Sequence, residues 1–102
     1  MSGEVWRYTL PIDDGWHTLH LSGRVLHVAQ RIAHPGDLER VELWVLHTDG
    51  PEVPREFRVY GTGQPIGGGD QGLTVEYVGT VLAPPEGLLV WHVFERVSRR
   101  VD

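Results

Sequence analysis

The sequence predicts an all-β fold, a single small sandwich or barrel-like domain of about seven short strands. Apolar and β-branched runs recur between turn signals, and no segment repeats its apolar residues with the 3.6-residue period of a helix. Gly and Pro punctuate the last third of the chain, as in connections between strands. The length of 102 residues suits one domain with one core.

The first half of the chain contains four expected strands. A strand at 5–10 ends in a turn, and a second strand covers 16–21. Ser22 and Gly23 predict a tight hairpin turn into a third strand at 24–29. These three segments combine β-branched and aromatic residues, which suit a half-buried sheet surface.

A loop around His34 and Pro35 precedes the fourth expected strand, 41–46. The best helical candidate, 35–40, is too short to form a stable helix by itself. The fourth strand alternates, with three residues on one face and two on the other: Val41, Leu43 and Val45 against Trp44 and Leu46. A turn is expected between Asp49 and Pro54.

The last third predicts a β-meander of three strands, 57–60, 74–82 and 88–94, with a Gly-rich connection at 61–69. The final strand is apolar on both faces, which indicates burial on two sides. A domain this small seldom covers both faces of a sheet with its own chain, so we expect a homo-oligomer.

The amino-acid composition excludes several classes of function and site. The formal net charge of −5 and the pI of 5.6 argue against a general nucleic-acid binder. All nine basic residues are Arg, which excludes Lys-based Schiff-base chemistry and a Walker-type loop. Without cysteine, disulfides and thiolate zinc sites are excluded. With no leader or long apolar run, we expect a cytosolic protein without membrane contact. The domain is expected at 1–95, with a frayed tail at 96–102.

The Gly-rich connection has three interpretations. It resembles a phosphate-binding loop, but such loops lead into a helix and this one leads into a strand. Its glycines can serve a wide turn with positive φ angles. The connection can also form a flap, in which glycine amides such as that of Gly63, the Thr62 hydroxyl and the Gln64 amide would cup an anion.

The six histidines do not predict a metal site, and no cofactor is indicated. His17 and His20 fall on opposite faces of one strand, and no His-x-His pair occurs. His92 shares a strand face with Val90 and Phe94, which suggests a packed, half-buried imidazole. The three serines lie outside any nucleophile elbow, so nucleophilic catalysis is not indicated.

The chain contains four tryptophans, at positions 6, 16, 44 and 91. They suit sheet packing, and they also suit a stacking surface for a planar base or a hot spot for a protein partner. Arg58 beside Tyr60 would bind a nucleotide by a charge-assisted fork to phosphate and by stacking.

Three blocks, 57–66, 77–81 and 89–95, resemble a family of small proteins of unknown function encoded in tailed-phage and actinobacterial genomes. The Gly-Thr-Gly-x-Pro-Ile block and the closing Trp-His-Val-Phe-Glu strand carry most of the resemblance. The resemblance supplies no catalytic residues. It implies a phage or prophage context, in which some small proteins sequester nucleotide-type immune signals of the host.

Three functions follow as hypotheses. The leading one is a non-enzymatic phage accessory protein that binds a small anionic, nucleotide-like ligand. Its expected ligand-binding residues are Arg58, Tyr60, Thr62, Gly63, Gln64, Trp91 and His92. Arg58 would meet the negative charge, and Tyr60 or Trp91 would stack. The alternative is a structural or protein-interaction module, and the third is a small hydrolase with His92 or His20 as base.

Overall fold

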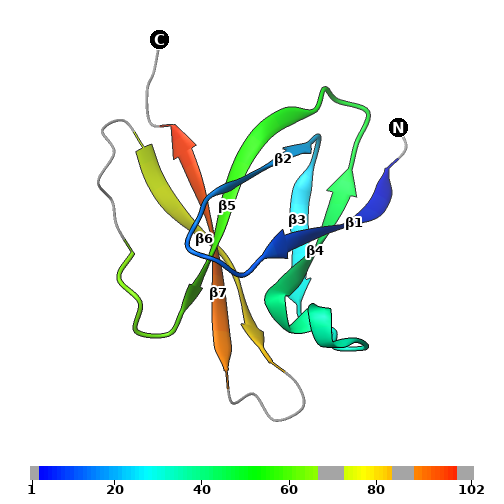
Figure 1. Cartoon of the computed structure of the whole chain (residues 1–102). Helices are drawn as coiled ribbons and strands as arrows, with labels where there is room; N and C mark the ends of the chain where they lie inside the picture. The colour runs from blue at the N-terminus through cyan, green and yellow to red at the C-terminus, as the bar shows by residue number, and fades with distance from the viewer. Residues whose placement is uncertain (1–2, 67–72, 84–88, 99–102) are drawn as a thin grey trace.

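The structure, a computed structural model, describes residues 3–66, 73–83 and 89–98. Within them the chain forms a sandwich of two antiparallel sheets (Figure 1). The strands are β1 (Glu4–Pro11), β2 (His17–Leu21), β3 (Arg24–Ala29), β4 (Arg40–His47), β5 (Val53–Gly61), β6 (Leu73–Leu82) and β7 (Val90–Ser98), and a short 3₁₀ helix, η1 (Pro35–Glu39), precedes β4. The predicted all-β class and the seven predicted strands are confirmed.

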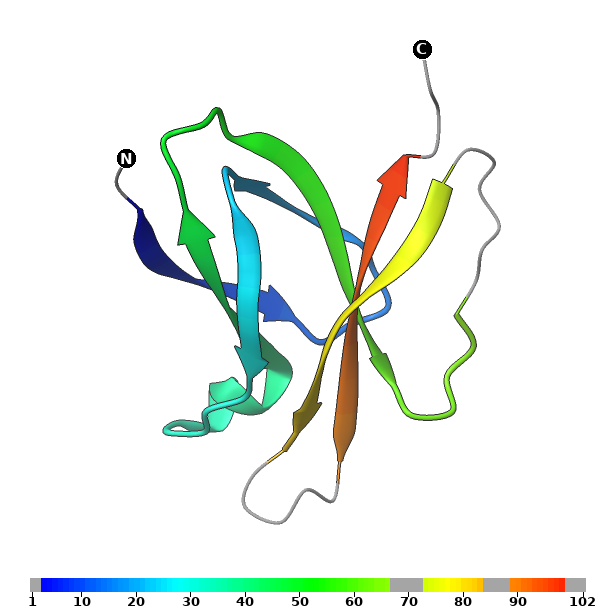
Figure 2. The same ribbon diagram turned by 180° about the vertical axis from the view of Figure 1, so that it is seen from behind.

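The two sheets share the strands unevenly. One sheet has three strands in the order β1-β4-β3, and the other has four in the order β2-β5-β7-β6. The chain crosses between the sheets three times, after β1, β2 and β4, and both views show the sheets facing each other (Figures 1 and 2). Strands of the two sheets are therefore interleaved along the first half of the sequence.

The predicted hairpin at Ser22-Gly23 is wrong, because β2 and β3 belong to different sheets. The two residues form a corner instead. The Ser22 hydroxyl donates to the Thr48 carbonyl at 2.9 Å, and its oxygen lies 2.9 Å from His47 Nδ1. A Cβ atom on Gly23 would lie 1.6 Å from the Leu46 carbonyl oxygen, so the close approach requires glycine.

The predicted meander is also wrong, because β7 lies between β5 and β6. Gly61, at the end of β5, pairs with Trp91, whereas Leu73, at the start of β6, pairs with Ser98. These partners are seven residues apart on β7, about 23 Å in a strand. The Gly-rich connection therefore joins opposite ends of the sheet and is no turn between neighbouring strands. Gly67, Gly68 and Gly69 lie outside the described residues.

Two strands extend beyond their expected ends. β5 begins at Val53, inside the expected turn, and includes Pro54 near its start, where the sheet tolerates proline. β7 continues through Arg96 to Ser98, although a frayed tail was expected from residue 96. Arg96 pairs in register with Glu56, and their side chains form an ion pair at 2.5 Å. Residues 99–102 lie outside the described part of the chain.

The core lies between the sheets. Alternation sends every second residue of each strand inward, as predicted for β4. The three-stranded sheet contributes the buried residues Leu10, Val28, Val41, Leu43 and Val45, and the four-stranded sheet contributes Leu21, Phe57, Val59, Val81 and Val93. The opposite, outer faces of both sheets are left for other contacts.

In the part of the chain that the structure describes, each sheet contains one β-bulge that changes which side chains face outward. In β3 the register shifts between Val25 and His27, and as a result His27 pairs with Trp44. In β6 it shifts between Tyr77 and Gly79, and Thr80 then pairs with His92. An extra residue in one strand re-aims the residues that follow it. His27 and Thr80 therefore lie on outer faces.

Candidate functional site

The outer side of the four-stranded sheet carries a row of aromatic rings that crosses the strands. The Tyr60 ring contacts Trp16 and Phe94 edge-on, with centroids 6.3 and 5.6 Å apart. Tyr77 continues the row, 5.7 Å from Phe94. We call this surface, with its neighbouring outward residues on β5, β6 and β7, the aromatic face. Edge-to-face packing fixes the rings relative to one another.

Two arginines cover ring faces within this row. The Arg58 guanidinium lies 4.5 Å from the Tyr60 centroid, and that of Arg96 lies 4.7 Å from the Trp16 centroid. Such contacts are cation–π interactions. Tyr60 is only 2% exposed. Its ring therefore serves as a buried support for Arg58 and is not placed to stack on a planar ligand.

A chain of hydroxyl groups and one imidazole crosses the same face. Thr62 Oγ1 lies 2.9 Å from His92 Nε2, and His92 Nδ1 lies 3.1 Å from Thr80 Oγ1. Thr80 in turn lies 2.6 Å from the Tyr77 hydroxyl. The chain ties β5, β7 and β6 together. It depends on the β6 bulge, which places Thr80 opposite His92.

The contact between Thr62 and His92 has the distance of a nucleophile and its base. The second ring nitrogen of His92, however, meets a neutral hydroxyl rather than a carboxylate. A carboxylate at that position is what stabilises the imidazolium formed during catalysis. The arrangement is therefore better suited to cross-linking strands than to hydrolysis. His20 of β2, the other suggested base, pairs with Pro54 of β5 and does not contact this chain of hydrogen bonds.

Two of the side chains expected to hold an anion, those of Gln64 and Arg58, contact other groups of the protein. The Gln64 side-chain oxygen accepts the Gly61 amide at 3.0 Å, and its nitrogen donates to Asp14 at 3.2 Å. The Arg58 guanidinium lies 3.9 Å from the same Asp14 oxygen. The exposed carboxylate of Asp14 thus contacts two of the side chains that the sequence predicted to bind a ligand.

The predicted site divides between two sides of the sheet. Arg58, Tyr60, Thr62 and His92 lie together on the aromatic face. Trp91 points to the opposite side and packs against the core, since neighbouring strand residues alternate. A shallow pocket of about 390 Å³ lies beside it, lined by Gly61, Thr62, Leu89, Val90 and Trp91.

Gly63 has a φ angle of 88°, the only positive φ among the described residues. This confirms, for one position, the prediction that the glycines of the connection adopt positive φ angles in a turn.

A family model for a domain of unknown function, DUF7352, matches residues 1–102. The chain belongs to the DUF7352 family. Searches of curated proteins and of solved structures gave no match to it. The family description assigns no activity, so the aromatic face and its contacts are the basis for any functional assignment of this DUF7352 domain.

Sequence reasoning did not identify four residues of the aromatic face of this DUF7352 domain as site residues: Trp16, Tyr77, Thr80 and Phe94. Phe94 could have been found, because it alternates with Val93 and shares a face with His92. Thr80 could not, since simple alternation across the bulge assigns it to the wrong face.

Within the described ranges, no group of three or more His, Asp or Glu side chains is placed to hold a metal ion. Among the same residues, no helix has the length and apolar character needed to cross a membrane. His17 and His20 pair with Phe57 and Pro54, respectively, on opposite faces of β2 as predicted. His17 instead bonds Asp13 at 2.8 Å, and this bond lowers the pKa of the Asp13 carboxyl.

Proposed function

We propose that this DUF7352 domain is a non-enzymatic interaction module, of phage or prophage origin, that associates with a second copy of itself through the aromatic face. The observation that carries the proposal is the apolar border of that face on β6. Tyr77 and Leu82 lie on the same side of β6, and they are 61% and 66% exposed, respectively. Aromatic and arginine-rich surfaces of this kind are typical of protein interfaces.

A second copy suits this border for two reasons. β6 is the edge strand of its sheet, and an edge with apolar neighbours invites association unless another surface covers it. A two-fold axis near β6 would place Tyr77 and Leu82 of one protomer against the same residues of its partner, which is self-complementary. Burying one leucine side chain in this way stabilises the assembly by about 2 kcal/mol.

The test compares two leucines of similar exposure. Leu82→Glu places a charge in the proposed contact, and Leu38→Glu places the same charge on η1, where Leu38 is 55% exposed. We expect light scattering after size-exclusion chromatography to give an oligomer for the parent and for Leu38→Glu, and a monomer for Leu82→Glu. A monomeric parent, or an oligomer that survives Leu82→Glu, contradicts the proposal.

The small anionic ligand predicted from the sequence is the competing function. The pocket of about 390 Å³ beside Thr62 and Trp91 favours it, because its volume lies in the range of small-molecule sites. The contacts of Asp14 with Arg58 and Gln64 count against it. A thermal-shift screen with cyclic and linear nucleotides separates the two. Self-association without a shift supports the interaction module, and a shift lost in Trp91→Leu supports the ligand.

A further inference from the structure

The outer side of the three-stranded sheet carries a second surface, distinct from the aromatic face. The ladder registers place Arg7, Trp44 and His27 in one row across β1, β4 and β3. The next rows add Arg24 beside Leu46 and Glu42 beside Ala29. We call the surface formed by Arg7, Arg24, His27, Arg31, Glu42 and Trp44 the arginine face.

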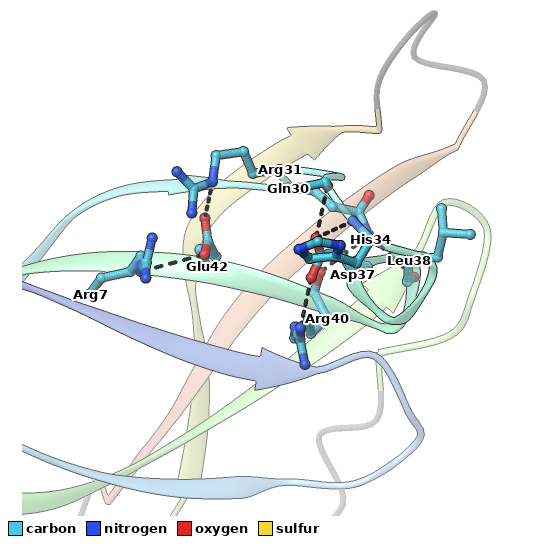
Figure 3. A network of polar contacts seen from close by, with 9 residues as sticks. Arg7, Gln30, Arg31, His34, Asp37, Leu38, Arg40 and Glu42 are labelled. Carbon is cyan, nitrogen blue, oxygen red and sulfur yellow. Dashed lines mark hydrogen bonds and ion pairs between the residues drawn. The ribbon is translucent and has the colours of Figure 1, made fainter.

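Glu42 holds two of these arginines in place. Its two carboxylate oxygens lie 3.5 Å from Nε of Arg7 and 3.5 Å from Nε of Arg31 (Figure 3). The Glu42 side chain is only 13% exposed, whereas Arg7 is 49% and Arg31 66% exposed. One largely buried carboxylate thus orients two guanidinium groups from below and balances only one of their charges.

The segment that follows β3 is also fixed, which limits where Arg31 can lie. Gln30 is 7% exposed, and its amide donates to the carbonyls of Asp37 and Leu38 at 3.3 and 3.2 Å (Figure 3). The Asp37 carboxylate accepts the amides of Ala33 and His34 at 2.8 and 2.9 Å, and these bonds lower its pKa to about 2. Arg31 therefore leaves an anchored part of the backbone.

An aromatic centre accompanies the charges. The β3 bulge brings His27 outward against Trp44, with ring centroids 5.8 Å apart, and Arg7 pairs with Trp44 on its other side. Without the extra residue, the alternation of β3 would turn His27 toward the core. A tryptophan flanked by an arginine and a second aromatic ring has the composition of an interface hot spot.

The charge on this face is opposite to that of the whole molecule. The face has three arginines and one glutamate, whereas the remaining sequence has six arginines and 13 acidic residues (9 − 3 and 14 − 1). Such segregation favours an anionic partner at this one place. We propose that the arginine face binds an acidic segment of another polypeptide, with a carboxylate on Arg7 or Arg31 and an apolar side chain on Trp44.

A polypeptide suits the face better than a nucleic acid. β3 extends only from Arg24 to Ala29, a distance of about 17 Å, and Arg31 follows two residues after its end, so the cationic area is short. A nucleic acid would carry its regular negative charge past this area onto a protein of net charge −5. An acidic segment of a few residues would place its negative charges on the arginines alone and not on the acidic remainder of the protein.

The test uses the full chain and a labelled hexaglutamate peptide, with hexaglutamine as the neutral control, in fluorescence anisotropy. We expect hexaglutamate to bind at about 50 mM salt and to be released near 0.5 M, because exposed charges are screened. Arg7→Gln with Arg31→Gln should weaken binding about fivefold or more. Arg58→Gln, the same change on the opposite sheet, should leave binding unchanged. Thermal unfolding confirms that each variant is folded, and Arg31→Gln alone replaces the double variant if that one is not.

Four outcomes overturn the proposal: no binding of hexaglutamate, equal binding of hexaglutamine, equal weakening by Arg58→Gln, or tighter binding of an oligothymidylate of matched charge. The last outcome would assign the face to single-stranded nucleic acid. Because the test does not involve β6, its failure is distinguishable from a failure of the proposed self-association.

Discussion

One ion pair inside the sandwich connects distant parts of the chain. Arg55 Nε and Nη2 donate to the two carboxylate oxygens of Glu95 at 2.7 and 2.8 Å. Its third nitrogen, Nη1, donates to the Gly23 carbonyl at 2.6 Å. The bond to Glu95 raises the pKa of Arg55. A single side chain thus joins β5, β7 and the corner between the sheets.

Replacing Arg55 alone should be costly, because Glu95 is 8% exposed and would be left as a buried, unpaired charge. We expect Arg55→Met to lower the free energy of unfolding by about 3 kcal/mol or more. The double variant Arg55→Met/Glu95→Leu should lose less than Arg55→Met, since no charge is stranded. Urea unfolding of the four proteins in this cycle gives the comparison. A double variant that is less stable than Arg55→Met would contradict this account.

At the scale of single residues, the sequence predicted well which side chains point inward. It predicted poorly which polar side chains pair with each other. Val41, Leu43 and Val45 are fully buried, as the alternation in β4 required. The pairing of Arg55 with Glu95 joins residues 40 positions apart and could not be predicted, because it depends on β5 and β7 being neighbours. The same holds for Asp14, which meets Gln64 across 50 positions.

At the scale of elements, the corner at Gly23 depends on a contact between backbones. A Cβ atom there would lie 1.6 Å from the Leu46 carbonyl oxygen and 2.8 Å from its carbon, and neither can rotate away. We expect Gly23→Ala to cost about 3 kcal/mol or more in the free energy of unfolding. Gly36→Ala is the matched control, since nothing lies within 4 Å of its Cβ position, and should change stability by less than about 0.5 kcal/mol. Equal stabilities of the two variants in urea unfolding would refute the corner contact.

The elements themselves were predictable, whereas their connections were not. Strand signals are local, so all seven strands were expected close to their observed places. Sheet order does not depend on local sequence alone. Ser22-Gly23 has the composition of a hairpin turn, yet it forms a corner. The reason is its contacts with Leu46, near the end of β4, and with Thr48, just after β4. The bulges escaped prediction for a related reason, since a one-residue shift is visible only against the partner strand.

At the scale of the whole molecule, the sandwich turns two different surfaces outward. The aromatic face lies on the four-stranded sheet and the arginine face on the three-stranded sheet, with the shared core between them. In the predicted site, residues of the aromatic face were combined with Trp91 from the core side, because local sequence does not show which side of a sheet faces a second sheet. The arginine face was missed because its charges come from separate segments, at Arg7, Arg24 and Arg31.

The two surfaces should act independently, because a layer of buried side chains separates them. Substitutions at separate sites that share no partners have nearly additive effects. We therefore expect Leu82→Glu to abolish self-association while changing the dissociation constant for hexaglutamate by less than about twofold. In turn, Arg7→Gln with Arg31→Gln should leave the oligomeric state unchanged. Light scattering and anisotropy on the same preparations test both directions. If Leu82→Glu weakened peptide binding as much as loss of the arginines does, the peptide site would have to span two protomers, and the two faces would form one composite surface.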